Sequence, residues 1–220
     1  MYSNSSIMNL AFDSRPLTLD TLDWVANAYY EEWGYETEGP DELARLVARW
    51  FCSHVVTQAT FGHLLVKDEQ LAGVTLGSVH GDHPLLAPLP DDWNEARLHE
   101  RILRYPEGPS TLRIYETMFA LNESLRREAQ TQGNPCSAEL LFLWVSPKHR
   151  GEGLSKTLLN RAMDTFRQRG QSDFCLFTDS HCDVSFYQRT PWRALTSCAW
   201  PDDIPQMPQV KELMFARDLF

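Results

Sequence analysis

The sequence lacks an apolar run long enough to cross a membrane, for which about 20 consecutive apolar residues are needed. No secretory leader is expected either, because residues 1–6 do not look like the start of one: they are polar and uncharged, and no cleavage-like pattern follows an apolar stretch. Internal repeats and low-complexity segments are absent. A membrane-spanning protein, a secreted protein and a repeat array are therefore not expected.

Cysteines are few, and histidines are poorly arranged for metal binding. The five cysteines are an odd number without CxxC spacing, which favours reduced thiols and a cytoplasmic location. The histidines show no compact metal-binding spacing, so no metal is expected. His181 and Cys182 are adjacent, and adjacent side chains rarely meet, so a Cys-His nucleophile pair is not expected either.

Positive charge is also scarce, with 20 Lys and Arg against 30 Asp and Glu, and the formal net charge is −10. Nucleic-acid-binding proteins usually carry a basic surface, so this charge argues against that class. The acidic balance slightly favours a cationic substrate. A chain of 220 residues with 43% apolar residues suits one domain over residues 1–220, and a homodimer remains open.

The segment 139–159 carries the clearest functional pattern. Residues 140–145 are apolar at every position, as expected for a strand buried on both faces. A basic loop ending at Arg150 follows, then Gly151 and Gly153, and then an amphipathic helical pattern from Leu154. The first N–H groups of a helix have no intrahelical acceptor, so this arrangement predicts a site for an anion such as pyrophosphate.

Several loop motifs could explain these glycines. A P-loop requires glycine directly before Lys-Ser/Thr, where this chain has Ser155. A dinucleotide-binding loop requires a third glycine, where this chain has Lys156. An ordinary βα turn with two glycines remains open. Residues 150–155, Arg-Gly-Glu-Gly-Leu-Ser, resemble the Arg-x-x-Gly-x-Gly/Ala pyrophosphate loop of the GCN5-related N-acetyltransferase (GNAT) superfamily, with Ser155 as a departure.

A second segment strengthens this resemblance. Phe186-Tyr187, followed by Pro191-Trp192, is similar to the family's Phe-Tyr pair that ends a helix ahead of a Gly-Phe strand start. Pro191 and Trp192 replace Gly and Phe, and Ser180 and Asp183 replace the usual Asn and Ala. The resemblance covers residues 138–200, which would form the cofactor-binding core.

The resemblance implies an α/β fold with a mixed, mostly antiparallel sheet, the GNAT acyl-CoA N-acyltransferase fold. Its central parallel pair would be Leu140–Val145 and Phe174–Phe177, with a helix over 154–169 across it. Residues 81–135 would be a helical insertion between the third and fourth strands. The pattern of the remaining chain predicts strands at Ile7–Phe12, Phe61–Lys67, Leu71–Val79, Trp192–Trp200 and Val210–Arg217, and helices from Thr18 or Asp20 to Trp33, from about 41 to Cys52, and at Glu95–Arg104, Thr111–Gln130 and Ser180–Arg189.

The function implied by the resemblance is acetyl-CoA-dependent N-acetyl transfer to a small amine or a peptide amine by direct attack. A non-catalytic acyl-CoA-binding or regulatory module on the same fold is the alternative, and the departures at Ser180, Asp183 and Pro191 keep it open. By resemblance, the cofactor would be bound by Leu143, Trp144, Val145, Arg150, Gly151, Glu152, Gly153, Leu154, Ser155, Lys156, Ser180, Phe186 and Tyr187.

The resemblance also implies two catalytic roles. Tyr187 holds the position of the family's general acid, and a phenol can protonate the leaving thiolate; a core tyrosine is the alternative. Glu139 holds the position of the general base in the histone-acetyltransferase branch, and strand alternation would place it on one face with Leu143 and Val145. An exposed strand start is the alternative for Glu139, and Glu116 is a competing carboxylate. The aromatic and acidic segment 29–33 would serve packing or an acceptor pocket.

Overall fold

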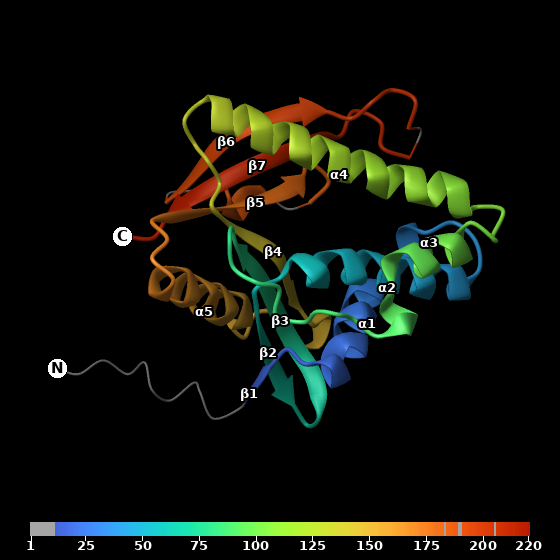
Figure 1. The fold of residues 1–220 in the computed structure, drawn as a ribbon, viewed down its shortest axis with the longest axis horizontal. Coiled ribbons are helices and arrows are strands. Elements are labelled where there is room, and N and C mark those ends of the chain that lie inside the picture. Colours follow the sequence, from blue (N-terminus) through green and yellow to red (C-terminus); the bar gives the residue numbers. More distant parts are fainter. Residues whose placement is uncertain (1–11, 183, 189–190, 205) are drawn as a thin grey trace.

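The computed structural model describes residues 12–182, 184–188, 191–204 and 206–220. In these residues one sheet of seven strands has the order β1-β2-β3-β4-β5-β7-β6. Among the strands of the described residues, only β4 and β5 pair in parallel (Figure 1). The mixed, mostly antiparallel sheet with this central parallel pair is confirmed. In chain order the elements are β1 Asp13–Pro16, α1 Leu22–Trp33, α2 Asp41–Gln58, β2 Phe61–Lys67, β3 Gln70–Val79, α3 Glu95–Ile102, α4 Gly108–Thr131, β4 Ala138–Val145, α5 Leu154–Gln168, β5 Asp173–Asp179, β6 Trp192–Ala199 and β7 Lys211–Asp218.

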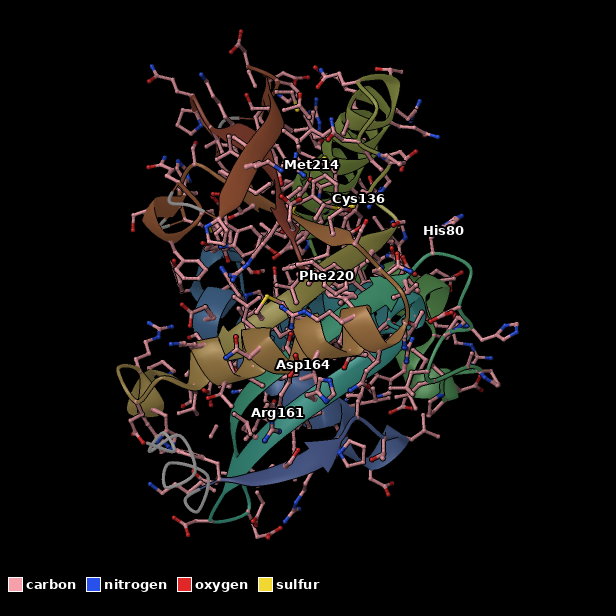
Figure 2. All side chains as sticks on the ribbon, turned by 90° about the vertical axis from the view of Figure 1, so that its left-hand side faces the viewer. His80, Cys136, Arg161, Asp164, Met214 and Phe220 are labelled. Carbon is pink, nitrogen blue, oxygen red and sulfur yellow. A yellow bond between two sulfur atoms is a disulfide. The ribbon has the colours of Figure 1, made fainter. Side chains whose placement is uncertain are left out.

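The two faces of the sheet are covered by different helices. Helix α5 lies across one face of the sheet. The centroid of the Phe166 ring lies 5.1 Å from that of Phe61 and 5.0 Å from that of Phe174. Figure 2 shows α5 in front of the strands, with Arg161 and Asp164 labelled on it. Helices α1 and α2 cover the other face at β2–β4, and the second half of α4 covers it at β5 and β7. No helix in the described residues is long and apolar enough to span a membrane.

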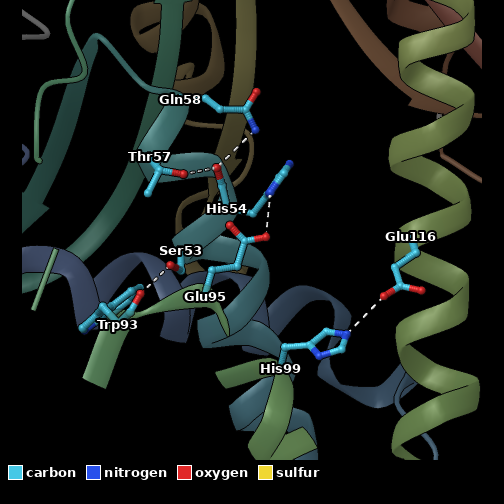
Figure 3. Close-up of polar contacts among 8 residues, drawn as sticks. All are labelled: Ser53, His54, Thr57, Gln58, Trp93, Glu95, His99 and Glu116. Carbon is cyan, nitrogen blue, oxygen red and sulfur yellow. Dashed lines mark hydrogen bonds and ion pairs between the residues drawn. The ribbon is translucent and has the colours of Figure 1, made fainter. Parts of the chain in front are cut away.

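Along the chain, helices α3 and α4 follow β3 and precede β4, although these two strands are neighbours in the sheet. The predicted helical insertion is therefore confirmed. Polar and aromatic contacts fasten the insertion to α1 and α2. The Tyr29 hydroxyl donates to the Tyr115 hydroxyl at 3.1 Å, and the ring of His54 stacks on Phe119 at 4.1 Å. His54 Nδ1 also lies 3.1 Å from Glu95 Oε1 (Figure 3). The insertion therefore packs against α1 and α2 as part of the folded domain.

One predicted strand lies outside the described residues, and one predicted helix differs from the structure. The predicted strand Ile7–Phe12 lies outside the described residues except for Phe12, and the first described strand is β1. The predicted helix Ser180–Arg189 is wrong, since the described part of that segment contains only a 3₁₀ turn at Val184–Phe186. Asp179 Oδ1 accepts the backbone N–H groups of His181 and Cys182 at 2.7 and 3.1 Å, and such local hydrogen bonds compete with a helix.

The expectation of reduced thiols is wrong for two of the five cysteines. Cys136 and Cys175, 39 residues apart, form a disulfide, whereas Cys52, Cys182 and Cys198 are free. The disulfide lies where β4 and β5 pair, because Cys175 is the register partner of Glu139. The sequence offered no sign of it because this contact depends on the parallel pairing of two distant strands.

Glu212 on β7 is a buried carboxyl group with an unusual titration. It is 2% exposed, and the Trp200 indole N–H donates to its Oε2 at 3.0 Å. Burial raises the pKa of Glu212 to about 8, and the charge of Asp179 adds to the rise. Glu212 is therefore protonated in the folded protein at neutral pH.

This titration predicts a pH-dependent stability. Between about pH 4.3, the reference pKa of glutamate, and about pH 8, the folded state holds a proton that the unfolded state lacks. Raising the pH through this window therefore destabilises the fold, by up to about 1.4 kcal/mol per pH unit. Glu212→Gln cannot ionise and can still accept from Trp200, so it should become increasingly more stable than the parent as the pH rises. Urea unfolding at pH 5 and pH 8 tests this; the same stability difference at both pH values would contradict it.

Candidate active site

Strands β4 and β5 diverge after a single point of pairing. Their only register pair in the described residues is Glu139 with Cys175, near the start of both strands. Strand β4 then continues to Val145 and β5 to Asp179, with no further register pair between them in the described residues. The side of β4 that faces β5 therefore offers unpaired backbone groups, to which an extended ligand can add like a further strand.

A β-bulge in β4 changes which side chains face the two sides of the sheet. Leu76 pairs with Phe142, but Gly77 pairs with Leu140, so Leu141 is an extra residue. Leu143 and Val145 pack on the α5 side, whereas Phe142 and Trp144 pack against the helices of the other side. The prediction that simple alternation places Glu139 with Leu143 and Val145 is wrong, because the bulge shifts the alternation.

The loop after β4 presents backbone donors, as the sequence predicted. Gly151 and Gly153 have φ angles of 84° and 80°, in the left-handed region that favours glycine, and a Cβ on either would meet nothing within 4 Å. The first N–H group that donates within α5 is that of Thr157, to the Gly153 carbonyl at 3.1 Å. The N–H groups of Leu154 to Lys156 precede this ladder at the positive end of the helix dipole, where an anion is stabilised.

The end of β4, the loop and the last turn of α1 line a common open cavity of about 260 Å³. Most of its lining residues were predicted to bind the cofactor, and three were not, namely Glu32, Trp33 and His149. The predicted residues in the lining are Leu143, Trp144, Val145, Arg150, Gly151, Gly153, Leu154 and Ser155. Two predicted cofactor residues, Glu152 and Lys156, are exposed beside this cavity but do not line it. The Glu152 carboxylate lies 3.0 Å from His149 Nδ1 instead.

Of the three residues that were missed, two carried a signal in the sequence. Glu32 and Trp33 belong to the aromatic and acidic segment at the end of α1, which had been considered for an acceptor pocket. Arg150 in the loop forms an ion pair with Glu32, 118 residues away in sequence. The described structure therefore places a negative charge beside the guanidinium that was expected to meet an anion.

Tyr187, the predicted general acid, packs against the apolar cluster beneath α5 and is not among the residues that line the cavity. The centroid of its ring lies 5.1 Å from that of Trp192 and 5.6 Å from that of Phe215. Tyr187 and Leu143 pack against the same apolar cluster. Burial raises the pKa of Tyr187, and the neighbouring Cys182 adds to the rise. The phenol is therefore protonated at neutral pH, which is the state that a proton donor requires.

The two candidate bases lie away from the cavity. Glu139 is at the point where β4 and β5 pair, and Arg126 of α4 donates to its Oε2 at 2.7 Å. Burial raises the pKa of Glu139, and Arg126 opposes the rise. Glu116 is on the exposed side of α4, where its Oε1 lies 3.2 Å from His99 Nε2 (Figure 3). Any base role for either carboxylate therefore requires a connection through water.

Two further predicted cofactor residues have structural contacts of their own. The Ser180 N–H donates to the Lys211 carbonyl at 2.9 Å, and the Lys211 N–H donates to Ser180 Oγ at 3.0 Å. These two hydrogen bonds connect the loop after β5 to the start of β7. Phe186 is 51% exposed, with its ring 5.3 Å from that of Tyr187.

The described residues also bring potential metal ligands together, although the histidine spacing predicted none. The ligand atoms of Cys136, Glu139 and Cys175 all lie within 4.8 Å of one another. Two of these atoms are the sulfurs of the disulfide, and Arg126 engages the carboxylate. In this state the group has no free thiolate to offer to a metal.

Comparison with known families identifies the fold and the class of protein. Residues 19–190 match the model of the acetyltransferase (GNAT) family, which is most of the chain. The chain therefore belongs to the GNAT family, as the two sequence motifs suggested. No curated protein sequence matches it significantly.

Solved structures of acetyltransferases share the fold at low sequence identity. Arylalkylamine N-acetyltransferase 2 from Aedes aegypti is 14% identical, with a TM-score of 0.54 over 95% of this chain and 99% of that one. The ribosomal-protein-S18-alanine N-acetyltransferase from Escherichia coli is 11% identical, with a TM-score of 0.51 over 94% of each chain. The protein yncA from Salmonella typhimurium, whose structure contains acetyl-CoA, is 11% identical, with a TM-score of 0.51 over 96% of this chain and 95% of that one. Acetyltransferases of this fold use acetyl-CoA, in agreement with the cofactor expected from the sequence.

Proposed function

We propose that this protein is an N-acetyltransferase that transfers the acetyl group of acetyl-CoA to a small amine or a peptide amine by direct attack. The divergence of β4 and β5 beside a glycine loop is the observation that carries the proposal. The pantetheine arm would pair with the free side of β4 at Leu143 to Val145, and the pyrophosphate would accept from the N–H groups of residues 151–155.

Different residues of the site would bind the cofactor, protonate the leaving thiolate and deprotonate the amine. Acetyl-CoA supplies an activated thioester, and the protein holds it in place and handles the protons. Tyr187 would protonate the departing thiolate. The acceptor amine must be neutral to attack, and a free alkylamine has a reference pKa of about 10.4, so a base is needed at neutral pH. Glu139, acting through water, is our candidate for this role.

The Glu139 role predicts a particular pH dependence. Glu139→Gln should slow turnover most at low pH, where the amine is hardest to deprotonate, and should lose much of its effect at high pH. Glu116→Gln, which removes the competing carboxylate, should leave the pH profile of kcat/KM unchanged. If the parent profile persists in Glu139→Gln but changes in Glu116→Gln, the two assignments must be exchanged.

A panel of amines tests the proposed activity directly. Acetyl-CoA is supplied with each amine, and the released thiol is measured with a thiol-detecting reagent. At least one amine should release thiol well above the rate of spontaneous hydrolysis and should itself gain an acetyl group by mass spectrometry. Tight binding of acetyl-CoA without turnover of any amine would favour the alternative, a non-catalytic acyl-CoA-binding module.

A further inference from the structure

An ion pair lies in the lining of the proposed cofactor cavity. Arg150 comes from the loop after β4, and Glu32 comes from the last turn of α1. Both side chains line the cavity, together with Gly151, Gly153 and Ser155. The Glu32 side chain is 26% exposed and the Arg150 side chain is 55% exposed, so the carboxylate is the more enclosed partner.

This carboxylate is in an unfavourable place for a site that takes an anion. A pyrophosphate at the start of α5 would share a cavity of about 260 Å³ with a second negative charge. The guanidinium of Arg150 would be attracted by both anions, and opposite charges at this range interact appreciably even near a surface. Glu32 therefore competes with the pyrophosphate for Arg150, and its negative charge also repels the pyrophosphate.

We propose that Glu32 is a displaceable counter-ion that holds Arg150 in the empty enzyme and weakens the binding of the cofactor. Entry of the pyrophosphate breaks the Arg150–Glu32 pair and turns the guanidinium toward the phosphates. This inference rests on the proposed function, because it assumes a coenzyme A ligand in this cavity. It goes further by assigning a role to a residue of α1 outside the glycine loop.

The proposal has a consequence for turnover. Acetyl-CoA and the product coenzyme A carry the same pyrophosphate, so Glu32 weakens both to a similar extent. Equal weakening of substrate and product raises KM and speeds product release. Without Glu32, KM for acetyl-CoA should fall, and kcat should fall as well wherever product release limits the reaction. A residue that only stabilised the fold would not change both constants in this direction.

Titration calorimetry with coenzyme A, on the full chain, tests the proposal. Glu32→Gln should bind coenzyme A about three- to tenfold more tightly than the parent, the range expected for loss of a partly exposed ion pair and its repulsion. The matched control is Glu31→Gln, which removes the same charge one residue away from an exposed side chain that does not line the cavity. Its affinity should stay within about twofold of the parent.

A double-mutant cycle with Arg150→Ala shows whether the effect passes through the ion pair. The gain from Glu32→Gln should shrink by more than half in the Arg150→Ala background. Unchanged or weaker binding by Glu32→Gln, an equal gain from Glu31→Gln, or a gain that is undiminished without Arg150 would each overturn the proposal while leaving the proposed function intact. Failure of the parent protein to bind coenzyme A would overturn both.

Discussion

Gly153→Asp is expected to abolish the binding of acetyl-CoA, with an affinity loss of about a hundredfold or more. Gly153 directly precedes α5 and has a φ angle of 80°. An aspartate there places a carboxylate among the N–H groups that would bind the pyrophosphate, so it accepts their hydrogen bonds and repels the ligand. The measurement is titration calorimetry of the variant with acetyl-CoA.

The structure provides a matched control for the backbone cost of this change. Gly133, which follows α4, has a φ angle of 81°, and a Cβ there also meets nothing within 4 Å. Gly133→Asp therefore imposes a similar left-handed strain and the same charge outside the site. It should bind acetyl-CoA with the parental affinity. If Gly153→Asp also binds normally, the glycine loop is an ordinary βα turn and the cofactor assignment fails.

Tyr187→Phe is expected to lower kcat by about ten- to a hundredfold, which corresponds to about one to three kcal/mol of barrier stabilisation. The substitution retains the ring that packs on Trp192 and Phe215 and removes only the hydroxyl. Since the lost group would act on the leaving thiolate, the affinity for acetyl-CoA should change little. Steady-state kinetics with a turned-over amine, together with calorimetry, separates the two effects.

Removal of a hydroxyl elsewhere controls for general effects on the fold. Tyr105 lies between α3 and α4, away from the cavity residues, and Tyr105→Phe should keep the parental kcat. Parental turnover by Tyr187→Phe would show that this tyrosine is a packing residue. The alternative considered from the sequence, a core tyrosine, would then be correct.

The central unit of the fold could be predicted because its signals are local. The continuous apolar run at 140–145 predicts a strand buried on both faces, and the apolar spacing after Gly153 predicts the helix that follows. The length of the hairpin β2–β3 was likewise readable from its apolar pattern. Each of these predictions depends on residues within one or two elements.

Most of the features that were missed depend on contacts between distant elements, and one depends on local side-chain hydrogen bonds. The bulge at Leu141 exists only in the register with β3, so no pattern within β4 reveals it. The pairing of Glu139 with Arg126 requires α4 to cross the start of β4. The helix expected at 180–189 does not form, because backbone N–H groups donate to the Asp179 carboxylate and Ser180 exchanges hydrogen bonds with Lys211. Local propensity is a weak guide where such side-chain contacts compete with it.

A crystal structure of this protein with acetyl-CoA tests the central claim most directly. The pyrophosphate should lie within hydrogen-bonding distance of the N–H groups of residues 151–155, and the pantetheine arm should lie between the diverging ends of β4 and β5 along Leu143 to Val145. The thioester sulfur should lie near the hydroxyl of Tyr187, and Arg150 should be turned from Glu32 to the phosphates. Acetyl-CoA bound elsewhere on the protein, with the cavity at the end of β4 free of it, would contradict the account.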